Sequence, residues 1–498
     1  MPNLMSNIRV TYSGFINLFT GLARVAAAFI FITLVTRSLS VEEFGHYNLV
    51  LSIITYVITS HWIISYWVTR EIARGNSSGR TALLSSGLFS SVGTLVFIIV
   101  GMLLSNSTNL DLKTIILAGS IVPLQFSHTI LSHIATGWKP QIASYGNLIL
   151  EFTRIPFVLI FLFVFNMGIN GVFLSLTISF LAGTMAMIYL NRNQLHAKFS
   201  LTILKIWLSR FWIPSYPTLT SIIYSFDFLI VTLLSSSEII GFYAAALTIG
   251  GFVSYSKLVA VGVYPKLLGK DRGKYLNENF RLWIYFALLF STISIAFAKA
   301  GLFVLNPAYE IVSIGVIFIT IRYFLFSIYD NFNSMLRATE TIDEIQNPTI
   351  KDFLKSKLFK LPTIQLFQYC GYISILAISL IFIKFSSTVD LILFWSVLSL
   401  IMQIPSTLII SIWVKKENLI QIKFLTVSKY FVSLIPTYFL IDFLNNSFLN
   451  YNTNFFEFVP MLLLILVVGI LTYIGITLIL DSNTRFLLKS IISELKHT

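Results

Sequence analysis

Charged side chains inside long apolar stretches are the features of this sequence best suited to chemistry. Arg24, Arg154, Lys257 and Arg322 are basic residues in such stretches, and Asp227 is an acid. A charge at the depth of a bilayer costs at least about 2–3 kcal/mol, so it must face water, a ligand or a counter-charge. Each of these residues is therefore a candidate for binding an anion, moving an ion or locking two helices together.

Arg24 is the first candidate for binding an anion. Asn17 and Thr20 precede it by seven and four residues, which places the three side chains on one face of a helix. A guanidinium group is always charged and can donate two parallel hydrogen bonds to a phosphate. The alternative is a structural ion pair that holds two helices together.

His61, Lys257 and Arg322 are further candidates for the same anion. His61 and Lys257 occupy equivalent positions in an internal repeat with an offset of 196 residues. Near-symmetric cations on facing helices would form an anion site. All three residues lie toward the cytoplasmic ends of their predicted helices, so the alternative is that their charges extend to the lipid headgroups.

Asp227 and Glu151 are the candidates for a proton or sodium relay. Asp227 follows Thr220 and Tyr224 along one face of a predicted helix that also carries two prolines. Kinked helices and lone intramembrane acids are typical of ion-coupling sites. The alternative for Asp227 is an ion pair with a cation such as Arg24. For Glu151 it is a self-neutralising pair with Arg154, three residues later.

Composition indicates which elements must position these residues. Charged residues make up 11% of the 498, against about 25% in an ordinary soluble domain, and mean hydropathy is +0.83. The apolar stretches run to about twenty residues, the length of a membrane-spanning helix, whereas barrel strands are about ten residues of alternating polarity. The predicted fold class is therefore an all-α, polytopic membrane protein.

The hydrophobic pattern predicts fourteen transmembrane helices. They lie at residues 11–36, 46–69, 81–104, 114–136, 142–165, 168–190, 211–234, 239–264, 280–301, 308–332, 361–383, 388–413, 425–444 and 456–480. Many of the connections are short, so neighbouring helices are expected to be antiparallel.

The distribution of Lys and Arg predicts the topology. One side of the predicted bundle carries 26 of these residues in its loops and helix ends, and the opposite side carries four. Under the positive-inside rule both termini are cytoplasmic, in a multi-pass protein of the cell membrane. The same rule accounts for the net charge of +13, so no nucleic-acid partner is expected.

Three segments outside the spans are expected on the cytoplasmic side. Residues 191–210 and 481–498 combine an apolar stripe with basic residues, which suits the surface of an anionic leaflet. Binding to a partner is the alternative for the tail. The charged loop at 338–360 has no predicted role beyond a cytoplasmic contact or regulation.

An internal repeat divides the spans into two halves. An offset of 196 residues aligns ten positions of residues 42–74 with the second half, including Gly45 with Gly241 and Tyr47 with Tyr243. We expect the glycines to form a tight turn and the tyrosines to anchor at the membrane interface. Parallel repeats predict two lobes around a central cavity. The predicted domains are 1–190 (N-lobe), 191–210 (linker), 211–413 (C-lobe), 414–480 (helices 13 and 14) and 481–498 (tail).

The opening of the sequence resembles the oligosaccharide flippases of the multidrug/oligosaccharidyl-lipid/polysaccharide exporter superfamily. The resemblance lies in Arg24 and in R-S-L-S-V-E-E-F-G-x-Y at 37–47, with Asp227 and the motif at 240–243 as counterparts in the second half. It implies a central cavity that opens toward lipid, and a substrate that carries sugars on a polyprenyl (pyro)phosphate. Such a transporter lies among membrane lipids, works as a monomer by alternating access, and uses H⁺ or Na⁺ as its coupling ion.

Two other classes are alternatives. A multidrug-type exporter of the same fold would use acids to bind cationic drugs. A membrane glycosyltransferase or polymerase would need an acidic metal-binding motif or a large outer loop, and no D-x-D occurs. The chain lacks the phosphate-binding G-x-x-x-x-G-K-[ST] and has one cysteine, Cys370. We therefore expect neither an enzyme nor a bound metal or cofactor.

Overall fold

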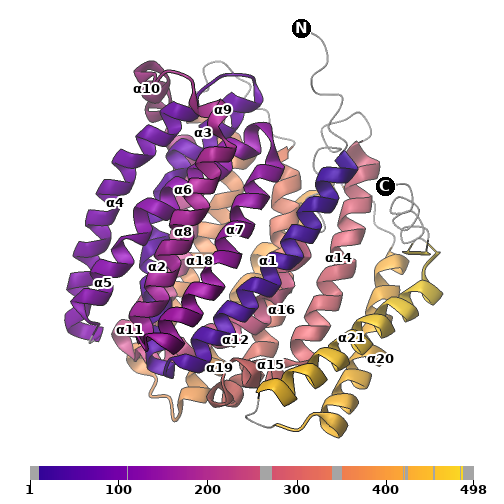
Figure 1. Ribbon diagram of the computed structural model, residues 1–498. Coiled ribbons are helices and arrows are strands. Elements are labelled where there is room, and N and C mark those ends of the chain that lie inside the picture. Colours follow the sequence, from indigo (N-terminus) through magenta and orange to yellow (C-terminus); the bar gives the residue numbers. More distant parts are fainter. Residues whose placement is uncertain are drawn as a thin grey trace. The chain divides into compact units, whose positions relative to one another are not determined.

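A computed structural model describes residues 10–108, 110–257, 272–338, 350–418, 420, 424–451, 455–482 and 484–485. Every element of regular structure within these residues is a helix (Figure 1). The all-α prediction is thereby confirmed.

The first half of the chain forms long helices interrupted by short irregular turns. In order they are α1 (Val10–Ser38), α2 (Val41–Ile58), the 3₁₀ turn η1 (Thr59–His61), α3 (Trp62–Ala73), α4 (Gly79–Thr108), α5 (Leu112–Gly119), α6 (Ile121–Trp138), α7 (Pro140–Leu159), the π-helical turn η2 (Ile160–Val164) and α8 (Gly168–Leu190). Two short helices follow, α9 (Arg192–Leu195) and α10 (Leu201–Ser209).

The second half repeats this pattern and adds two helices. Its elements are α11 (Trp212–Leu234), α12 (Ser237–Gly250), the 3₁₀ turn η3 (Gly251–Ser256), α14 (Arg272–Ala296), α15 (Ala298–Leu305), the 3₁₀ turn η5 (Pro307–Val312), α16 (Ser313–Ala338), α17 (Ile350–Lys355), α18 (Lys357–Phe382), α19 (Thr388–Lys416), α20 (Phe424–Phe448) and α21 (Phe455–Leu480).

The helices support the predicted spans. Within the described residues, twelve helical runs are long and apolar enough to cross a membrane, and α14 with α15 makes a thirteenth if this bent pair counts as one span. The remaining predicted span, 11–36, coincides with the 29 residues of α1. The chain is therefore a multi-pass, helical membrane protein.

One predicted span is not straight. The expectation at 280–301 was a single helix, but α14 and α15 meet at an angle of 70°. A break leaves backbone carbonyls without helical partners, which lipid cannot satisfy. The side-chain amide of Asn445 on α20 donates a hydrogen bond of 3.0 Å to the carbonyl of Ala296, the last residue of α14. The break is thus stabilised from a neighbouring helix.

The described residues form two compact units. Unit 1 comprises residues 1–244 and 336–398, and unit 2 comprises 245–335 and 399–498. Helices α12, α16 and α19 each continue from one unit into the other. The predicted lobes, 1–190 and 211–413, follow the sequence repeat rather than these contacts, and they stay a prediction.

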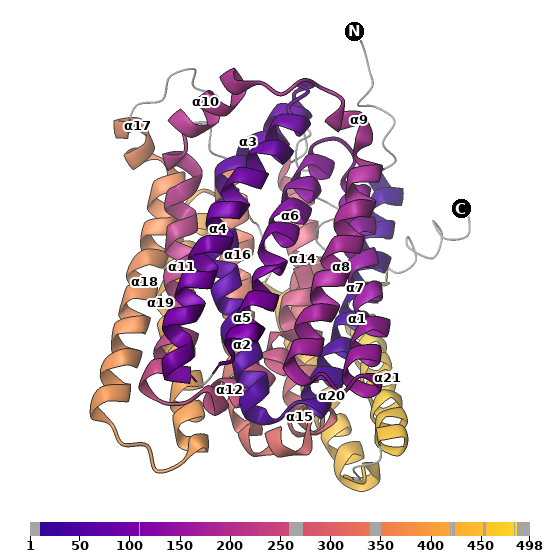
Figure 2. The ribbon, with the colours of Figure 1, turned by 60° about the vertical axis from the view of Figure 1, so that its left-hand side comes forward.

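Of the three predicted cytoplasmic segments, the linker is described throughout and the other two only in part. The linker contains α9 and α10, and Trp207 of α10 is buried in a core that includes Ile64 of α3 and Phe126 of α6. Figure 2 shows both short helices at one end of unit 1. In the loop at 338–360, residues 350–355 form α17, while 339–349 lie outside the described residues. Most of the tail, 486–498, also lies outside them.

The motif at 37–47 begins helix α2. The Ser40 hydroxyl accepts a hydrogen bond of 3.1 Å from the backbone N–H of Glu43, and the Glu43 carboxylate accepts one of 2.9 Å from the N–H of Ser40. This reciprocal capping box satisfies two backbone donors at the helix start and stabilises it by about 0.5–2 kcal/mol. Part of the motif that resembles the flippases is therefore a helix-start signal.

Gly45 and Gly241 mark a close crossing of α2 and α12. A Cβ atom added to Gly45 would lie within 3.0 Å of the Ser237 carbonyl oxygen, and one added to Gly241 within 3.0 Å of the Val41 carbonyl oxygen. Val41 and Ser237 are themselves equivalent in the repeat, so the crossing is reciprocal, as a two-fold relation requires. The expected tight turn was wrong. Glycine is required inside both helices because the two backbones touch there.

The tyrosines of the same motif are core residues. Tyr47 and Tyr243 expose 4% and 0% of their surface, so the expectation that they anchor at the membrane interface was wrong. The Tyr47 ring lies 5.7 Å from that of Phe173 on α8, and the Tyr243 ring stacks 3.6 Å from that of Trp395 on α19. These contacts fix α2 and α12 once the glycines have brought them together.

In both halves the helix that carries the motif passes into a 3₁₀ turn, and the two turns overlap in the repeat. The turn η1 begins at Thr59, and η3 ends at Ser256, which is equivalent to Ser60. A 3₁₀ turn in the middle of a long helix is a common site of bending, and η1 is such a turn because α3 follows it directly. Residues 258–271, which follow η3 and Lys257, lie outside the described residues.

Candidate functional site

Arg24 belongs to a cluster of ionisable residues on helices α1, α6 and α7 of unit 1. It lies half-buried on α1, within electrostatic range of Glu151 on α7 and of His128 on α6. Helix α7 packs against both α1 and α6, which carry the other members of the cluster. Figures 1 and 2 show α1, α7 and α8 side by side. We call Arg24, His128, Glu151 and Arg154 the arginine cluster. The side chain of Asn17, the predicted neighbour of Arg24 on α1, lies outside the described residues.

Glu151 and Arg154 form the ion pair that their spacing predicts. The guanidinium of Arg154 bonds the Glu151 carboxylate one turn away on α7, and the two side chains expose 14% and 15% of their surface. The same guanidinium lies 4.3 Å from the centre of the Phe31 ring on α1. The Glu151 carboxylate thus interacts electrostatically with two guanidinium groups, those of Arg154 and Arg24. Two of these three side chains are cationic and one is anionic.

Asp227 lies in a different environment, in which its carboxylate accepts hydrogen bonds from a tyrosine hydroxyl and a backbone N–H. Its side chain is 1% exposed, and Tyr372 of α18 donates a hydrogen bond of 2.9 Å from its hydroxyl to Oδ2. The indole Nε1–H of Trp395 on α19 donates to the Tyr372 hydroxyl oxygen at 2.6 Å. The backbone N–H of Phe228 donates to Oδ1 at 2.8 Å. We call Asp227, Tyr372 and Trp395 the Asp227 network.

Aromatic rings surround this network. Tyr224, one turn before Asp227, stacks on Tyr372 with ring centres 5.4 Å apart, and Tyr243 stacks on Trp395 at an angle of 7°. Tyr56 of α2 lies within electrostatic range of Asp227 and donates its hydroxyl to the carbonyl of Ser225. The neighbours of Asp227 therefore come from four other regions of the chain.

Sequence reasoning did not find Tyr372 or Trp395. Tyr372 is 145 residues from Asp227, and a single tyrosine on an apolar helix resembles any core residue. The signal available was Tyr243 of the repeated G-x-Y motif, because it packs against Trp395. The alternative of an ion pair between Asp227 and Arg24 stays a prediction.

His61 contacts polar groups of its own half. It is 9% exposed, its Nδ1 lies 2.9 Å from the Ser65 hydroxyl, and its ring centre is 5.5 Å from that of His133 on α6. The Thr69 hydroxyl donates to the carbonyl of His133 at 3.1 Å. His61 thus faces α6.

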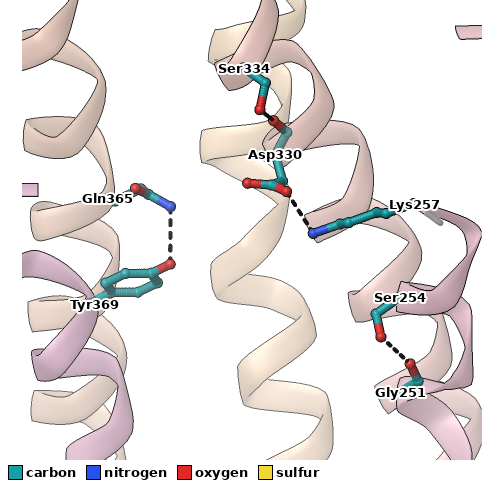
Figure 3. Close-up of polar contacts among 7 residues, drawn as sticks. All are labelled: Gly251, Ser254, Lys257, Asp330, Ser334, Gln365 and Tyr369. Carbon is teal, nitrogen blue, oxygen red and sulfur yellow. Dashed lines mark hydrogen bonds and ion pairs between the residues drawn. The ribbon is translucent and has the colours of Figure 1, made fainter. Parts of the chain in front are cut away.

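Lys257 and Arg322 lie in unit 2. Lys257 forms an ion pair of 2.6 Å with Asp330 of α16, and both side chains are more than one-third exposed (Figure 3). Arg322 is 5% exposed, and its guanidinium carbon lies 5.0 Å from the centre of the Tyr323 ring. The predicted anion site shared by His61 and Lys257 stays a prediction.

An apolar cavity of about 340 Å³ lies on unit 1. Its lining consists of Val57, Ser60, Ile63, Leu88, Phe89, Val92, Gly93 and Val96, from α2, η1, α3 and α4. One hydroxyl among seven apolar residues offers little to a phosphate or a sugar. The predicted site residues do not line this cavity.

Comparison with known proteins identifies the fold. No family model and no curated protein matches the chain. Among solved structures, it is similar to a multidrug resistance MATE family transporter of the MOP superfamily. The inward-facing form has a TM-score of 0.59 at 11% identity, covering 81% of this chain and 98% of that one. The outward-facing form has a TM-score of 0.52 at 13% identity, covering 82% and 95%.

A second protein gives the same result. The bent form of the Vibrio cholerae MATE transporter VcmN has a TM-score of 0.56 at 13% identity, and the match covers 83% of this chain and 99% of that one. Identities this low establish architecture and leave the substrate open. The chain has the two-lobed helical fold of the MATE transporters of the MOP superfamily.

Proposed function

We propose that the protein is an ion-coupled exporter that works by alternating access of two lobes. The fold supports this, since it is shared with transporters in inward-facing and outward-facing forms. The reciprocal crossing at Gly45 and Gly241 supports it as well, because parallel repeats place a substrate site between halves that can rock. The same proposal makes it a monomer of the cell membrane with both termini in the cytoplasm.

For the substrate, we propose a lipid-linked oligosaccharide moved from the cytoplasmic to the outer leaflet. The observation that carries this proposal is the arginine cluster, in which two guanidinium groups accompany one carboxylate on α1 and α7. Two guanidinium groups attract a phosphate anion, and the Arg24 side chain has the geometry to bind one through two parallel hydrogen bonds. The opening motif, which resembles the oligosaccharide flippases, agrees. Lys257, His61 and Arg322 would be secondary contacts.

The second candidate is an exporter of small cationic molecules. The comparisons favour it, because the solved structures of this fold are named as multidrug transporters. In this chain the feature that a cationic substrate would use is the buried Asp227 carboxylate. Those structures are transporters, so the enzyme alternative gains no support from them.

Reconstitution into vesicles separates the two candidates. The purified full-length protein is tested with a fluorescent polyprenyl pyrophosphate sugar and, separately, with a cationic DNA-intercalating dye. We expect the protein to expose the labelled lipid to an impermeant quencher, and Arg24→Ala to lose this activity. Transport of the dye alone, unaffected by Arg24→Ala and abolished by Asp227→Asn, would instead establish the small-molecule exporter.

A further inference from the structure

One side of the span formed by α2, η1 and α3 carries a row of polar and aromatic side chains. They recur every three or four residues, a spacing that places them on one side of a helix. They are Asn48, Ser52, Thr55, Thr59, Trp62 and Tyr66. On the opposite side, Ile54, Ile64 and Val68 expose at most 1% of their surface. We call the six residues the polar face of α2–α3.

The polar face is the exposed side of a segment that is long and apolar enough to cross a membrane, Val41–Ala73. Between Phe44 and Ile72, Thr55 and Trp62 are the two exposed residues, and all others are buried or half-buried. Trp62 exposes 40% of its surface. The exposed side of this span is therefore its polar side.

Helix α4 shows the opposite pattern. Its exposed stripe consists of large apolar side chains that expose 54% to 72% of their surface, namely Leu84, Leu88, Val92, Leu95, Ile99 and Leu103. Hydrocarbon cannot form hydrogen bonds with polar groups, so this stripe suits lipid. By the same criterion the polar face of α2–α3 suits water or a polar ligand.

The hydroxyl groups of the polar face are oriented as acceptors. Ser52, Thr55 and Thr59 each donate to the carbonyl one turn earlier on their own helix, at 2.9, 2.8 and 2.5 Å. A hydroxyl oxygen that donates in this way keeps its lone pairs for accepting. The three residues thus offer a row of acceptors, which suits a ligand that carries several hydroxyl donors.

Trp62 provides an aromatic surface beside these acceptors. Its ring centre lies 5.2 Å from that of His61, at an angle of 28°, and 5.6 Å from that of His133 on α6. Thr129 and Thr136 lie one turn before and one turn after His133, and both donate to their own helix at 2.8 Å. The two imidazoles hold the indole ring between hydroxyl groups of two helices.

We propose that the polar face of α2–α3 binds the sugars of the transported lipid, with Trp62 as the residue on which a sugar ring stacks. The C–H groups of a pyranose form an apolar surface that matches the indole ring, while its hydroxyl groups donate to the acceptors. The proposal rests on the lipid-linked substrate proposed above and specifies how its sugars are recognised. Helix α6 connects this face with the arginine cluster, because His128 interacts with Arg24 and His133 contacts Trp62.

Cysteine labelling tests whether the polar face meets water. In the full-length protein, Cys370→Ser removes the single native cysteine, and Thr55→Cys, Thr59→Cys or Leu88→Cys adds one. A maleimide reacts with the thiolate, which forms in water and not in hydrocarbon. We expect both polar-face variants to react at least about tenfold faster than Leu88→Cys, the control on the apolar stripe of α4.

Binding to two lipids tests the recognition of sugar. Native mass spectrometry of the purified protein measures the Kd of a polyprenyl pyrophosphate that carries sugars and of the same lipid without them. Trp62→Leu should raise the Kd of the sugar-bearing lipid about five- to tenfold, because a stacking surface is lost. The Kd of the sugar-free lipid should stay unchanged. Trp67→Leu, which removes a partly buried tryptophan of the same helix, should leave the ratio of the two Kd values as in the wild type.

Two outcomes would overturn the proposal while leaving the substrate in place. Labelling of Thr55→Cys and Thr59→Cys as slow as that of Leu88→Cys would place the polar face in lipid. An equal change of both Kd values in Trp62→Leu would show that Trp62 does not recognise sugar. A wild-type protein that binds neither lipid would instead refute the lipid-linked substrate itself, and the sugar site with it.

Discussion

The arginine cluster and the Asp227 network both lie in unit 1, the first half-buried and the second fully buried, and they surround charge in different ways. In the arginine cluster, charges face charges: Glu151 bonds Arg154 and lies in the field of Arg24. In the Asp227 network, the hydrogen bonds described above come to the carboxylate from the Tyr372 hydroxyl and the Phe228 backbone N–H. The first arrangement brings two guanidinium groups near one carboxylate, and we propose it as the anion site. The second holds its carboxylate through hydrogen bonds from a side-chain hydroxyl and a backbone N–H.

The repeat makes this difference more informative. With the offset of 196 residues, Asp227 corresponds to Phe31, whose ring lies under the Arg154 guanidinium, and Arg24 corresponds to Thr220. Each half contributes one glycine, Gly45 or Gly241, to the crossing of α2 and α12. The two halves thus share the glycine crossing but differ in the charges at these equivalent positions. We propose that the difference serves two different ligands, a substrate and a coupling ion.

The largest effect is expected where the repeats are identical. Gly45→Ala and Gly241→Ala should each destabilise the protein by about 1–3 kcal/mol or more, since the added methyl group meets a backbone carbonyl that cannot rotate away. Thermal unfolding in detergent measures this. Gly87→Ala on α4, where nothing lies within 4 Å, is the control and should be neutral or stabilising by up to about 1 kcal/mol. Equal melting temperatures for all three would refute the close crossing.

The next effect distinguishes the two regions by function. Arg24→Ala should lower lipid flipping by about ten- to a hundredfold while leaving the size-exclusion profile intact, because one charge-assisted pair of hydrogen bonds is lost. Arg24→Lys should recover part of the activity, as an ammonium group lacks the planar fork. Lys299→Ala, which removes an exposed pair with Glu310, is the control. Full activity in Arg24→Ala would remove this residue from the substrate site.

A change of coupling is expected from the Asp227 network, with a smaller effect on downhill transport. Asp227→Asn resembles the protonated state, so substrate exchange should persist while stimulation by an imposed pH gradient disappears. Transport in vesicles with and without the gradient measures the ratio. If the variant still responds fully to a pH or sodium gradient, Asp227 is structural and another residue couples the ion.

The smallest effect is expected at Lys257. Its ion pair with Asp330 is more than one-third exposed on both sides, and such pairs contribute about 0–1 kcal/mol. Because Asp330 already balances its charge, Lys257→Met should lower flipping less than about threefold, well below the effect of Arg24→Ala. A loss as large as that of Arg24→Ala, with the melting temperature unchanged, would place Lys257 beside Arg24 in the anion site.

The sequence was sufficient for features that depend on neighbours along the chain. Apolar stretches of helix length predicted the spans, because lipid requires every backbone group to be bonded within its own segment. The spacing of Glu151 and Arg154 predicted their ion pair, since residues three apart meet on one helix face. A fixed offset predicted the repeat, as aligned identities need no coordinates.

Only the tertiary structure decided which distant residues meet. Glycine occurs both in turns and at close helix crossings, so the G-x-Y motif alone could not show that Gly45 packs on Ser237. Tyr372 and Trp395 resemble ordinary core residues until α18 and α19 bring them to Asp227, 145 residues away in the case of Tyr372. Inside a bilayer every helix is apolar all round, so hydrophobic periodicity does not indicate which face meets which neighbour. The packing of small residues and hydrogen bonds between helices makes that choice.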